Sequence, residues 1–229
     1  MQQLTPRKKI GLVIFDCDGV LVDSELLSAS VLTQMMMERD LHINADIFRS
    51  EFLGRSFATA SKRYEQRLGV SFPADFNAEY RSRLLTQMKG NLHAMPGVES
   101  VLRAMKVPHC LATSSSPQRL AVSMAESGLG KFFVNVSFTA SEVEHGKPAP
   151  DLMLHAAKQM GVGPGFCLVI EDSEMGLRAA AAAAMEAWRF TGGGHLKEAD
   201  QLPSDIKPAR VLDSMSALLN AFREIGIAE

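Results

Sequence analysis

The sequence predicts an α/β fold: a doubly wound, Rossmann-like parallel sheet with a small all-helical cap inserted into it. From about residue 95 onward, short apolar runs alternate with helical patterns, which is typical of βαβ units. An isolated apolar run at residues 10–15 needs partners in the same sheet, because a lone strand is not stable. Between residues 24 and 90, apolar residues recur at helical spacing and no strand pattern interrupts them.

The first strand, residues 10–15, is a continuous apolar run, as expected of a parallel strand that is buried on both faces. In the segment that follows, Ser24 can cap a helix whose apolar residues are spaced three and four apart. Glycines and Pro73 then divide the rest of the segment. Helices are predicted over residues 24–39, 45–52, 57–68 and 74–89.

After Met95-Pro96-Gly97 the strand–helix alternation begins. Further strands are predicted over residues 109–113, 133–138, 166–170 and 187–190. Helices are predicted over residues 97–105, 117–127, 150–160, 173–184 and 215–224. We therefore expect an α/β core from residues 1–22 and 91–229, with residues 23–90 as the helical cap and hinges near 22–24 and 90–96.

The composition narrows the class of protein. The chain has 229 residues, 46% of them hydrophobic, and a net charge of −2, which gives no electrostatic reason to bind nucleic acid or an anionic membrane. No apolar segment approaches the roughly 20 residues of a membrane span, and residues 1–9 do not resemble a secretion signal. The three cysteines are isolated, which favours free thiols. We expect a cytoplasmic protein, either a monomer or a small homo-oligomer.

Two acidic residues, Asp16 and Asp18, directly follow the first strand. In open α/β sheets the functional site lies beyond the carboxyl ends of the strands. Two crowded carboxylates are costly there unless a cation or hydrogen bonds compensate them. A divalent metal ion is the natural candidate.

Other strand ends carry polar residues that complement this pair. Thr113 and Ser114 stand at a strand end just before a helix start, a favourable place for an anion. Lys147 precedes another helix, and Glu171-Asp172 end the strand at 166–170. Mg²⁺ prefers carboxylate oxygens and completes its shell with water and substrate phosphate. The set therefore predicts a site for Mg²⁺ and a phosphate group.

Four segments in this order resemble the motifs of the haloacid dehalogenase superfamily, in its branch of capped phosphatases and β-phosphoglucomutase-like enzymes. They are Asp16-Cys-Asp-Gly-Val, Thr113 after an apolar strand, Lys147-Pro-Ala-Pro-Asp, and Glu171-Asp-Ser-x-x-Gly. Each segment alone can be explained without any function, for example as a helix cap or a surface lysine. Their joint occurrence at successive strand ends favours the resemblance, which covers nearly the whole chain.

The resemblance implies a role for each residue. Asp16 would be the nucleophile that forms an aspartyl-phosphate, and Asp18 the general acid and base. Thr113 and Ser114 would hold phosphoryl oxygens, and Lys147 would neutralise charge on the phosphoryl group and on Asp16. Mg²⁺ would be bound by Asp16, the Asp18 carbonyl and Asp172, with Glu171 close by.

The resulting hypothesis is a Mg²⁺-dependent phosphatase of a small phosphorylated metabolite, a sugar or sugar-acid phosphate. A dehalogenase would not need Asp18. A hexose-phosphate mutase of this family is expected to carry histidine where Ser28 stands, and a cap arginine where Phe57 stands. Lys62 is the only mid-cap lysine that a phosphonate hydrolase could use.

A non-catalytic regulator with the same fold remains a rival from another class. For substrate specificity we expect a contribution from Arg55, which follows Gly54. Gly192-Gly193-Gly194 is predicted to be a loop, and we expect His195 after it to face solvent.

Overall fold

The computed structural model describes residues 9–41, 43, 45–196 and 202–229. Within these residues the chain forms a six-stranded, fully parallel sheet in the order β3-β2-β1-β4-β5-β6. The strands are β1 (Leu12–Phe15), β2 (His109–Thr113), β3 (Ser137–Thr139), β4 (Cys167–Glu171), β5 (Glu186–Phe190) and β6 (Arg210–Leu212). The predicted α/β fold class is confirmed.

The central strand β1 shows why the sheet is covered on both faces. Leu12 and Ile14 pack on one face, while Val13 and Phe15 pack on the other, and all four side chains are fully buried. Ile14 pairs with Cys110 of β2 on one side and with Val169 of β4 on the other. The continuous apolar run in the sequence is the consequence of this double burial.

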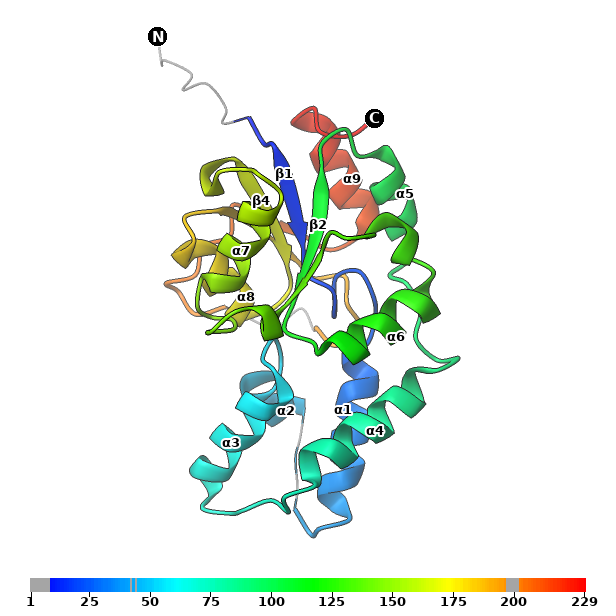
Figure 1. Ribbon diagram of the computed structural model, residues 1–229, viewed down its shortest axis with the longest axis vertical. Helices are drawn as coiled ribbons and strands as arrows, with labels where there is room; N and C mark the ends of the chain where they lie inside the picture. Colours follow the sequence, from blue (N-terminus) through cyan, green and yellow to red (C-terminus); the bar gives the residue numbers. More distant parts are fainter. Residues whose placement is uncertain (1–8, 42, 44, 197–201) are drawn as a thin grey trace.

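Helices that follow residue 97 supply the two covering layers (Figure 1). The helices α7 (Asp151–Gln159) and α8 (Glu174–Ala182) pack on the face of Leu12 and Ile14. The helices α5 (Val98–Ala104), α6 (Pro117–Ser127) and α9 (Met215–Glu224) contribute side chains to the opposite core. The 3₁₀ turns lie at Gly130–Phe132, Ala140–Glu142 and Pro164–Phe166.

The remaining helices, which we call the cap helices, lie together beyond the carboxyl ends of β1 and β2 (Figure 1). They are α1 (Glu25–Met37), α2 (Ala45–Glu51), α3 (Phe57–Leu68) and α4 (Phe76–Met88). Local sequence explains α3: the Ser56 side chain accepts a hydrogen bond from the Thr59 amide, and Gly69 ends the helix at a φ of 65°.

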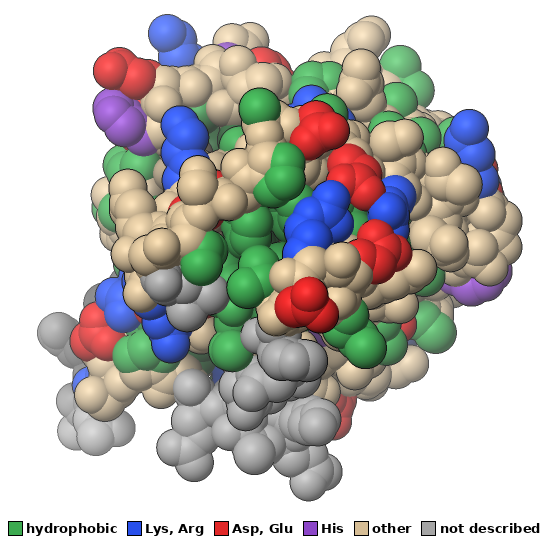
Figure 2. Space-filling view, turned by 90° about the horizontal axis from the view of Figure 1, so that it is seen from below, with side chains coloured by type: hydrophobic (Ala, Val, Ile, Leu, Met, Phe, Trp, Pro, Cys, Tyr) green, Lys and Arg blue, Asp and Glu red, His purple; other side chains and the backbone are tan. Residues whose placement is uncertain are grey.

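Aromatic packing holds the cap helices together. The rings of Phe57 and Tyr80 stack with centroids 3.6 Å apart, which joins α3 to α4. Arg39 pairs with Glu79 at 2.5 Å and Arg83 with Glu38 at 2.8 Å, which joins α1 to α4. The cap end in Figure 2 shows hydrophobic side chains in the centre, with neighbouring basic and acidic ones beside them.

One prediction for the sheet was wrong in part, and one strand was missed. The strand predicted at residues 133–138 is Ser137–Thr139, because Phe133 follows the turn at Gly130–Phe132 and Asn135 has a φ of 59°. Phe133 is apolar because it packs edge-on against His109, not because it extends a strand. The edge strand β6 was not predicted, since it has three residues and none of them is fully buried.

Two further observations agree with the composition. Cys17, Cys110 and Cys167 are buried and free. Among the residues that the structure describes, there is no helix of the length and apolarity that crossing a membrane requires.

Candidate active site

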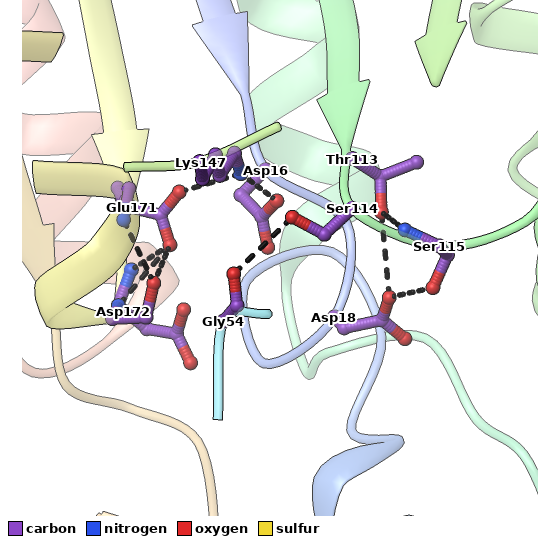
Figure 3. A network of polar contacts seen from close by, with 11 residues as sticks. Asp16, Asp18, Gly54, Thr113, Ser114, Ser115, Lys147, Glu171 and Asp172 are labelled. Carbon is purple, nitrogen blue, oxygen red and sulfur yellow. Dashed lines mark hydrogen bonds and ion pairs between the residues drawn. The ribbon is translucent and has the colours of Figure 1, made fainter. Parts of the chain in front are cut away.

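The residues predicted from the sequence come together at the carboxyl ends of β1, β2 and β4 (Figure 3), on the side of the sheet that faces the cap helices. Asp16 and Asp18 follow β1, Thr113 ends β2, and Glu171 ends β4. Lys147 reaches the same place from the loop before α7. Parallel strands put these ends on one edge of the sheet, so residues far apart in sequence meet there.

Lys147 lies at the centre of a buried ion cluster. Its Nζ is 2.5 Å from Asp16 Oδ1 and 2.8 Å from Glu171 Oε2, and the Lys147 side chain is 1% exposed. Burial alone would lower the pKa of Lys147, but the two carboxylates outweigh it and raise that pKa. Burial also acts to raise the pKa of Glu171, but Lys147 reverses the effect and the pKa is lowered. Lys147 therefore remains a cation, and Glu171 remains ionised.

Asp16 and Asp172 are the two acids of this cluster whose ionised forms are disfavoured. Burial and the neighbouring Glu171 raise the pKa of both carboxyl groups well above their ordinary values. Carboxylate oxygens of Asp16, Glu171 and Asp172 lie within 4.8 Å of one another. Three buried carboxylates that face a single lysine favour a bound cation, and a set of oxygen donors suits a hard divalent ion such as Mg²⁺. The residues present therefore fit a metal site.

A glycine allows Glu171 to lie so close to α8. A Cβ atom on Gly176 would stand 1.7 Å from Glu171 Oε2, so no other residue fits there without a shift. Ser173 caps the same helix by accepting a hydrogen bond from the Gly176 amide, and its hydroxyl donates to Glu171 Oε1 at 2.8 Å. The motif residues after Asp172 thus hold Glu171 in place.

Asp18 has a different environment from Asp16. It accepts hydrogen bonds from Ser24 Oγ at 2.5 Å, from Ser115 Oγ at 2.6 Å and from Thr113 Oγ1 at 3.4 Å (Figure 3 shows the last two). Arg119 Nη2 lies 2.6 Å from Asp18 Oδ1, the oxygen that also accepts from Ser24, while Thr113 and Ser115 donate to Oδ2. Burial opposes ionisation, but Arg119 and these hydroxyls outweigh it and lower the pKa of Asp18. The two acids of the first motif are therefore separated, with one in the lysine cluster and one against an arginine.

Arg119, on the first turn of α6, was missed by sequence reasoning. Its Nη2 also donates to Ser24 Oγ at 3.2 Å and Ser28 Oγ at 3.1 Å, at the start of α1. Burial would lower the pKa of Arg119, but Asp18 and Glu25 reverse this and raise it. The sequence did offer one signal for this role: Arg119 lies three residues after Ser116, in the first turn of a helix that starts at the site.

The candidate phosphate ligands Thr113 and Ser114 make contacts inside the protein. The Thr113 hydroxyl accepts from the Ser115 amide at 3.0 Å and donates to Asp18, while Ser114 Oγ donates to the Gly54 carbonyl at 3.2 Å. Gly54 also meets α8: a Cβ on it would lie 2.4 Å from Ser173 Oγ. The loop between α2 and α3 is thus seated on the core beside the site.

A cavity of about 600 Å³ opens from these residues toward the cap helices. Asp16, Asp18 and Lys147 lie in its wall, and Arg55, Phe57 and Tyr80 face them from the cap. Arg55 is half-buried and donates to the Ser50 carbonyl at 3.1 Å. Burial, reinforced by Arg63, lowers the pKa of Arg55. Arg55 therefore lies where a bound metabolite could contact it, and its role in substrate specificity stays a prediction.

Glu25, the first residue of α1, also lines this cavity and is buried. Burial raises its pKa to about 7, although Arg119 acts to lower it. Since the folded pKa exceeds the unfolded value, ionised Glu25 costs stability above pH 7, and the cost disappears as the pH falls toward 4.5. We expect the unfolding free energy of Glu25→Gln to exceed that of wild type by a margin that grows with pH. The margin should be near zero at pH 4.5 and on the order of 3 kcal/mol above pH 7.

Urea unfolding of both proteins at several pH values, in metal-free buffer, measures this difference. A difference in unfolding free energy that stays constant from pH 4.5 to 8 would contradict the prediction.

The expectation that His195 faces solvent was wrong. His195 is 6% exposed, and its Nε2 lies 2.8 Å from Asp172 Oδ2. The glycine-rich loop after β5 turns back toward the end of β4, where it brings the imidazole to the carboxylate cluster. The triple glycine in the sequence was a sign of this close approach, but it does not show the direction of the loop.

Comparison with known proteins agrees with this geometry. Residues 10–184 match the family model of the haloacid dehalogenase-like hydrolases. The chain is 29% identical to 6-phosphogluconate phosphatase of Escherichia coli, over 82% of this chain and 86% of that protein. It is 27% identical to a fructose-1-phosphate phosphatase of the same organism, over 76% of this chain and 93% of that protein.

A solved structure gives the same result. A hydrolase of this family from Deinococcus radiodurans, crystallised with bound phosphate and sodium, is 33% identical with a TM-score of 0.76. The alignment covers 96% of this chain and 98% of that one. The family resemblance inferred from the four motifs is therefore confirmed. The chain belongs to the haloacid dehalogenase-like hydrolases, among the phosphoric monoester hydrolases of that family.

Proposed function

We propose that this hydrolase is a Mg²⁺-dependent phosphatase that acts on a small phosphorylated metabolite, a sugar or sugar-acid phosphate, through an aspartyl-phosphate. The observation that carries the proposal is the buried cluster of Lys147 with Asp16 and Glu171, next to Asp172 and at the wall of a cavity. A binding protein has no need to retain such costly charges. The phosphatases of sugar and sugar-acid phosphates among its relatives support the substrate class.

In the first step, Asp16 attacks the phosphorus atom. A bond forms between its carboxylate oxygen and phosphorus, and the bond from phosphorus to the metabolite's oxygen breaks. The leaving oxygen takes a proton from Asp18. Lys147, with Thr113 and Ser114, stabilises the negative charge on the transferred group.

In the second step, water attacks the phosphorus of the aspartyl-phosphate while Asp18 takes its proton. The bond between phosphorus and Asp16 breaks, and inorganic phosphate leaves. Arg119 and the hydroxyls around Asp18 favour its ionised form, which is the form this step requires. The proton taken from water returns Asp18 to the protonated form that the first step of the next cycle requires. In the resting enzyme, where the ionised form is favoured, a substrate phosphate with a second pKa near 6 can bring the first proton.

The residues that would hold Mg²⁺ are Asp16, Asp172 and the main-chain carbonyl of Asp18, with Glu171 nearby. When bound, the ion neutralises charge on the carboxylates and the phosphoryl group. Lys147 supplies a further positive charge, in contact with Asp16 and Glu171.

We also propose that residues 23–90 act as a cap that closes on a core formed by residues 1–22 and 91–229. The two connections lie side by side: the Met95 amide donates to the Leu21 carbonyl at 2.8 Å, and the Asp23 amide to the His93 carbonyl at 3.2 Å. A paired hinge of this kind lets the cap helices move as a unit and exclude water. Arg55 and the other cap residues in the cavity wall would then contact the metabolite and determine which substrate is accepted.

A hexose-phosphate mutase is less well supported. Ser28, in the place where the family's mutases carry histidine, is buried, donates to the Ser24 carbonyl and accepts from Arg119. A hydroxyl so engaged provides no obvious relay for a proton to a sugar hydroxyl. Phosphate transfer to water is therefore preferred.

The test is phosphate release from a panel of phosphorylated metabolites, including 6-phosphogluconate, fructose 1-phosphate and glycerol 3-phosphate. With Mg²⁺ we expect release from at least one sugar or sugar-acid phosphate. Removal of the metal with EDTA should abolish release, because the three carboxylates then lack their cation. Added Mg²⁺ should restore release.

Calcium, which prefers a larger and more flexible shell, is a useful control and should restore little activity. Full activity in EDTA would reject the metal site. Conversion between hexose 1- and 6-phosphates without phosphate release would favour the mutase.

A further inference from the structure

His195 is the one buried histidine, among the described residues, that touches the proposed metal site. Its side chain is 4% exposed and that of Asp172 is 2% exposed, with Nε2 and Oδ2 2.8 Å apart. Neither residue lies in the wall of the cavity that opens toward the cap helices. A metabolite in that cavity would meet Asp16 and Asp18 first, so His195 is placed to act on Asp172 rather than on the substrate.

The backbone around His195 is built to receive the ring. A Cβ on Gly193 would lie 2.6 Å from His195 Cε1, and one on Gly19 would lie 2.7 Å from the same atom. The same Cβ on Gly19 would also stand 2.1 Å from Asp172 Oδ2, and Gly19 has a φ of 82°. The imidazole and the Asp172 carboxylate are therefore packed together against the loop that carries Asp16 and Asp18.

We propose that His195 is a positioning residue that orients the Asp172 carboxylate toward the divalent cation. The inference rests on the metal site of the proposed function and assigns a further residue to it. A carboxylate has two oxygens, so Asp172 can offer one to His195 and the other to the ion. Such outer partners of metal ligands fix ligand orientation, and their loss commonly weakens metal binding about 10–100-fold.

The contact identifies which ring nitrogen acts. Nε2 is the ring nitrogen at the contact, 2.8 Å from Asp172 Oδ2. Gln places an amide nitrogen near the position of Nε2 and can replace this polar contact, whereas Ala cannot. This difference separates orientation of Asp172 from simple filling of space.

The experiment is calorimetric titration of Mg²⁺ into wild type, His195→Ala and His195→Gln, in phosphate-free buffer without substrate. We expect the Mg²⁺ dissociation constant to rise about 10-fold or more in His195→Ala and to recover in large part in His195→Gln. His93→Ala is the matched control, because His93 is exposed, whereas His195 and the acidic cluster are buried. A His195→Ala protein that is folded by circular dichroism and binds Mg²⁺ as tightly as wild type overturns the proposal.

A second measurement needs no folded variant. In a long-range ¹H–¹⁵N spectrum of wild type, saturation with Mg²⁺ should shift the His195 ring signals. The other five histidines serve as internal references. Ring signals of His195 that do not move on Mg²⁺ saturation overturn the proposal even if every His195 variant fails to fold. Absence of Mg²⁺ binding to wild type would instead reject the proposed function.

Discussion

Asp16→Asn is expected to lower kcat for phosphate release at least about 10³-fold, because an amide cannot form the covalent phosphoryl intermediate. The substitution keeps the shape of the side chain, and Lys147 keeps its second partner, Glu171, at 2.8 Å. Phosphate release is measured on the best substrate of the panel and on p-nitrophenyl phosphate, which has a good leaving group. Both substrates should lose activity, since each requires the same attack on phosphorus.

The same variant should fold at least as stably as wild type in metal-free buffer. Burial and Glu171 raise the pKa of Asp16, so its ionised form costs stability at pH 7 and a neutral amide removes that cost. Thermal unfolding checks this point. Asp75→Asn is the matched control, because Asp75 is exposed and its side chain makes no cap hydrogen bond. An Asp16→Asn protein that keeps a tenth of wild-type activity would rule out Asp16 as the nucleophile.

Much of the fold was accessible from the sequence because its signals are local. Helices at Phe57–Leu68, Pro117–Ser127 and Met215–Glu224 and the strand His109–Thr113 have the predicted bounds. Apolar periodicity and caps such as Ser116 with Pro117 determine these elements. The site motifs could be brought together for a similar reason, since a parallel sheet places its strand ends on one edge.

What the sequence could not supply depends on long-range packing. An apolar residue such as Phe133 is expected both in a strand and in a loop that packs on the core. Phe133 packs against His109 after a turn, and this contact cannot be read from the local sequence. Arg119 has an ordinary place in an amphipathic helix, and its role follows from Asp18 and two cap serines that reach it across the interface. His195 is brought to Asp172 by the direction of a glycine-rich loop, which composition does not encode.

Lys147→Met is expected to reduce both stability and activity. Removal of one partner from a buried ion cluster leaves the others uncompensated, which costs about 3–5 kcal/mol of unfolding free energy. The loss should be largest in metal-free buffer at pH 8. Without Lys147 the folded pKa values of the remaining carboxyl groups lie above their unfolded values, so stability falls as the pH rises above about 4 and returns on acidification.

Urea unfolding at pH 4.5 and 8, with and without Mg²⁺, measures this dependence. Mg²⁺ should restore part of the stability, because a bound cation favours only the folded state. Lys158→Met is the control, since Lys158 is exposed on α7. Activity of Lys147→Met should fall about 10²–10³-fold even where the protein is folded, since the transferred phosphoryl group loses a fixed positive charge.

The double variant Lys147→Met with Glu171→Gln separates the two effects. Glu171 Oε2 is the second carboxylate oxygen at Lys147 Nζ, so its replacement by an amide removes one of the unpaired charges. If charge imbalance causes the instability, the double variant should be more stable than Lys147→Met at pH 8 and nearly equal to it at pH 4.5. Activity should not return, because neither substitution supplies a cation for the phosphoryl group. Equal stability of the two variants at pH 8 would show that Lys147 acts on stability through its packing and not through its charge.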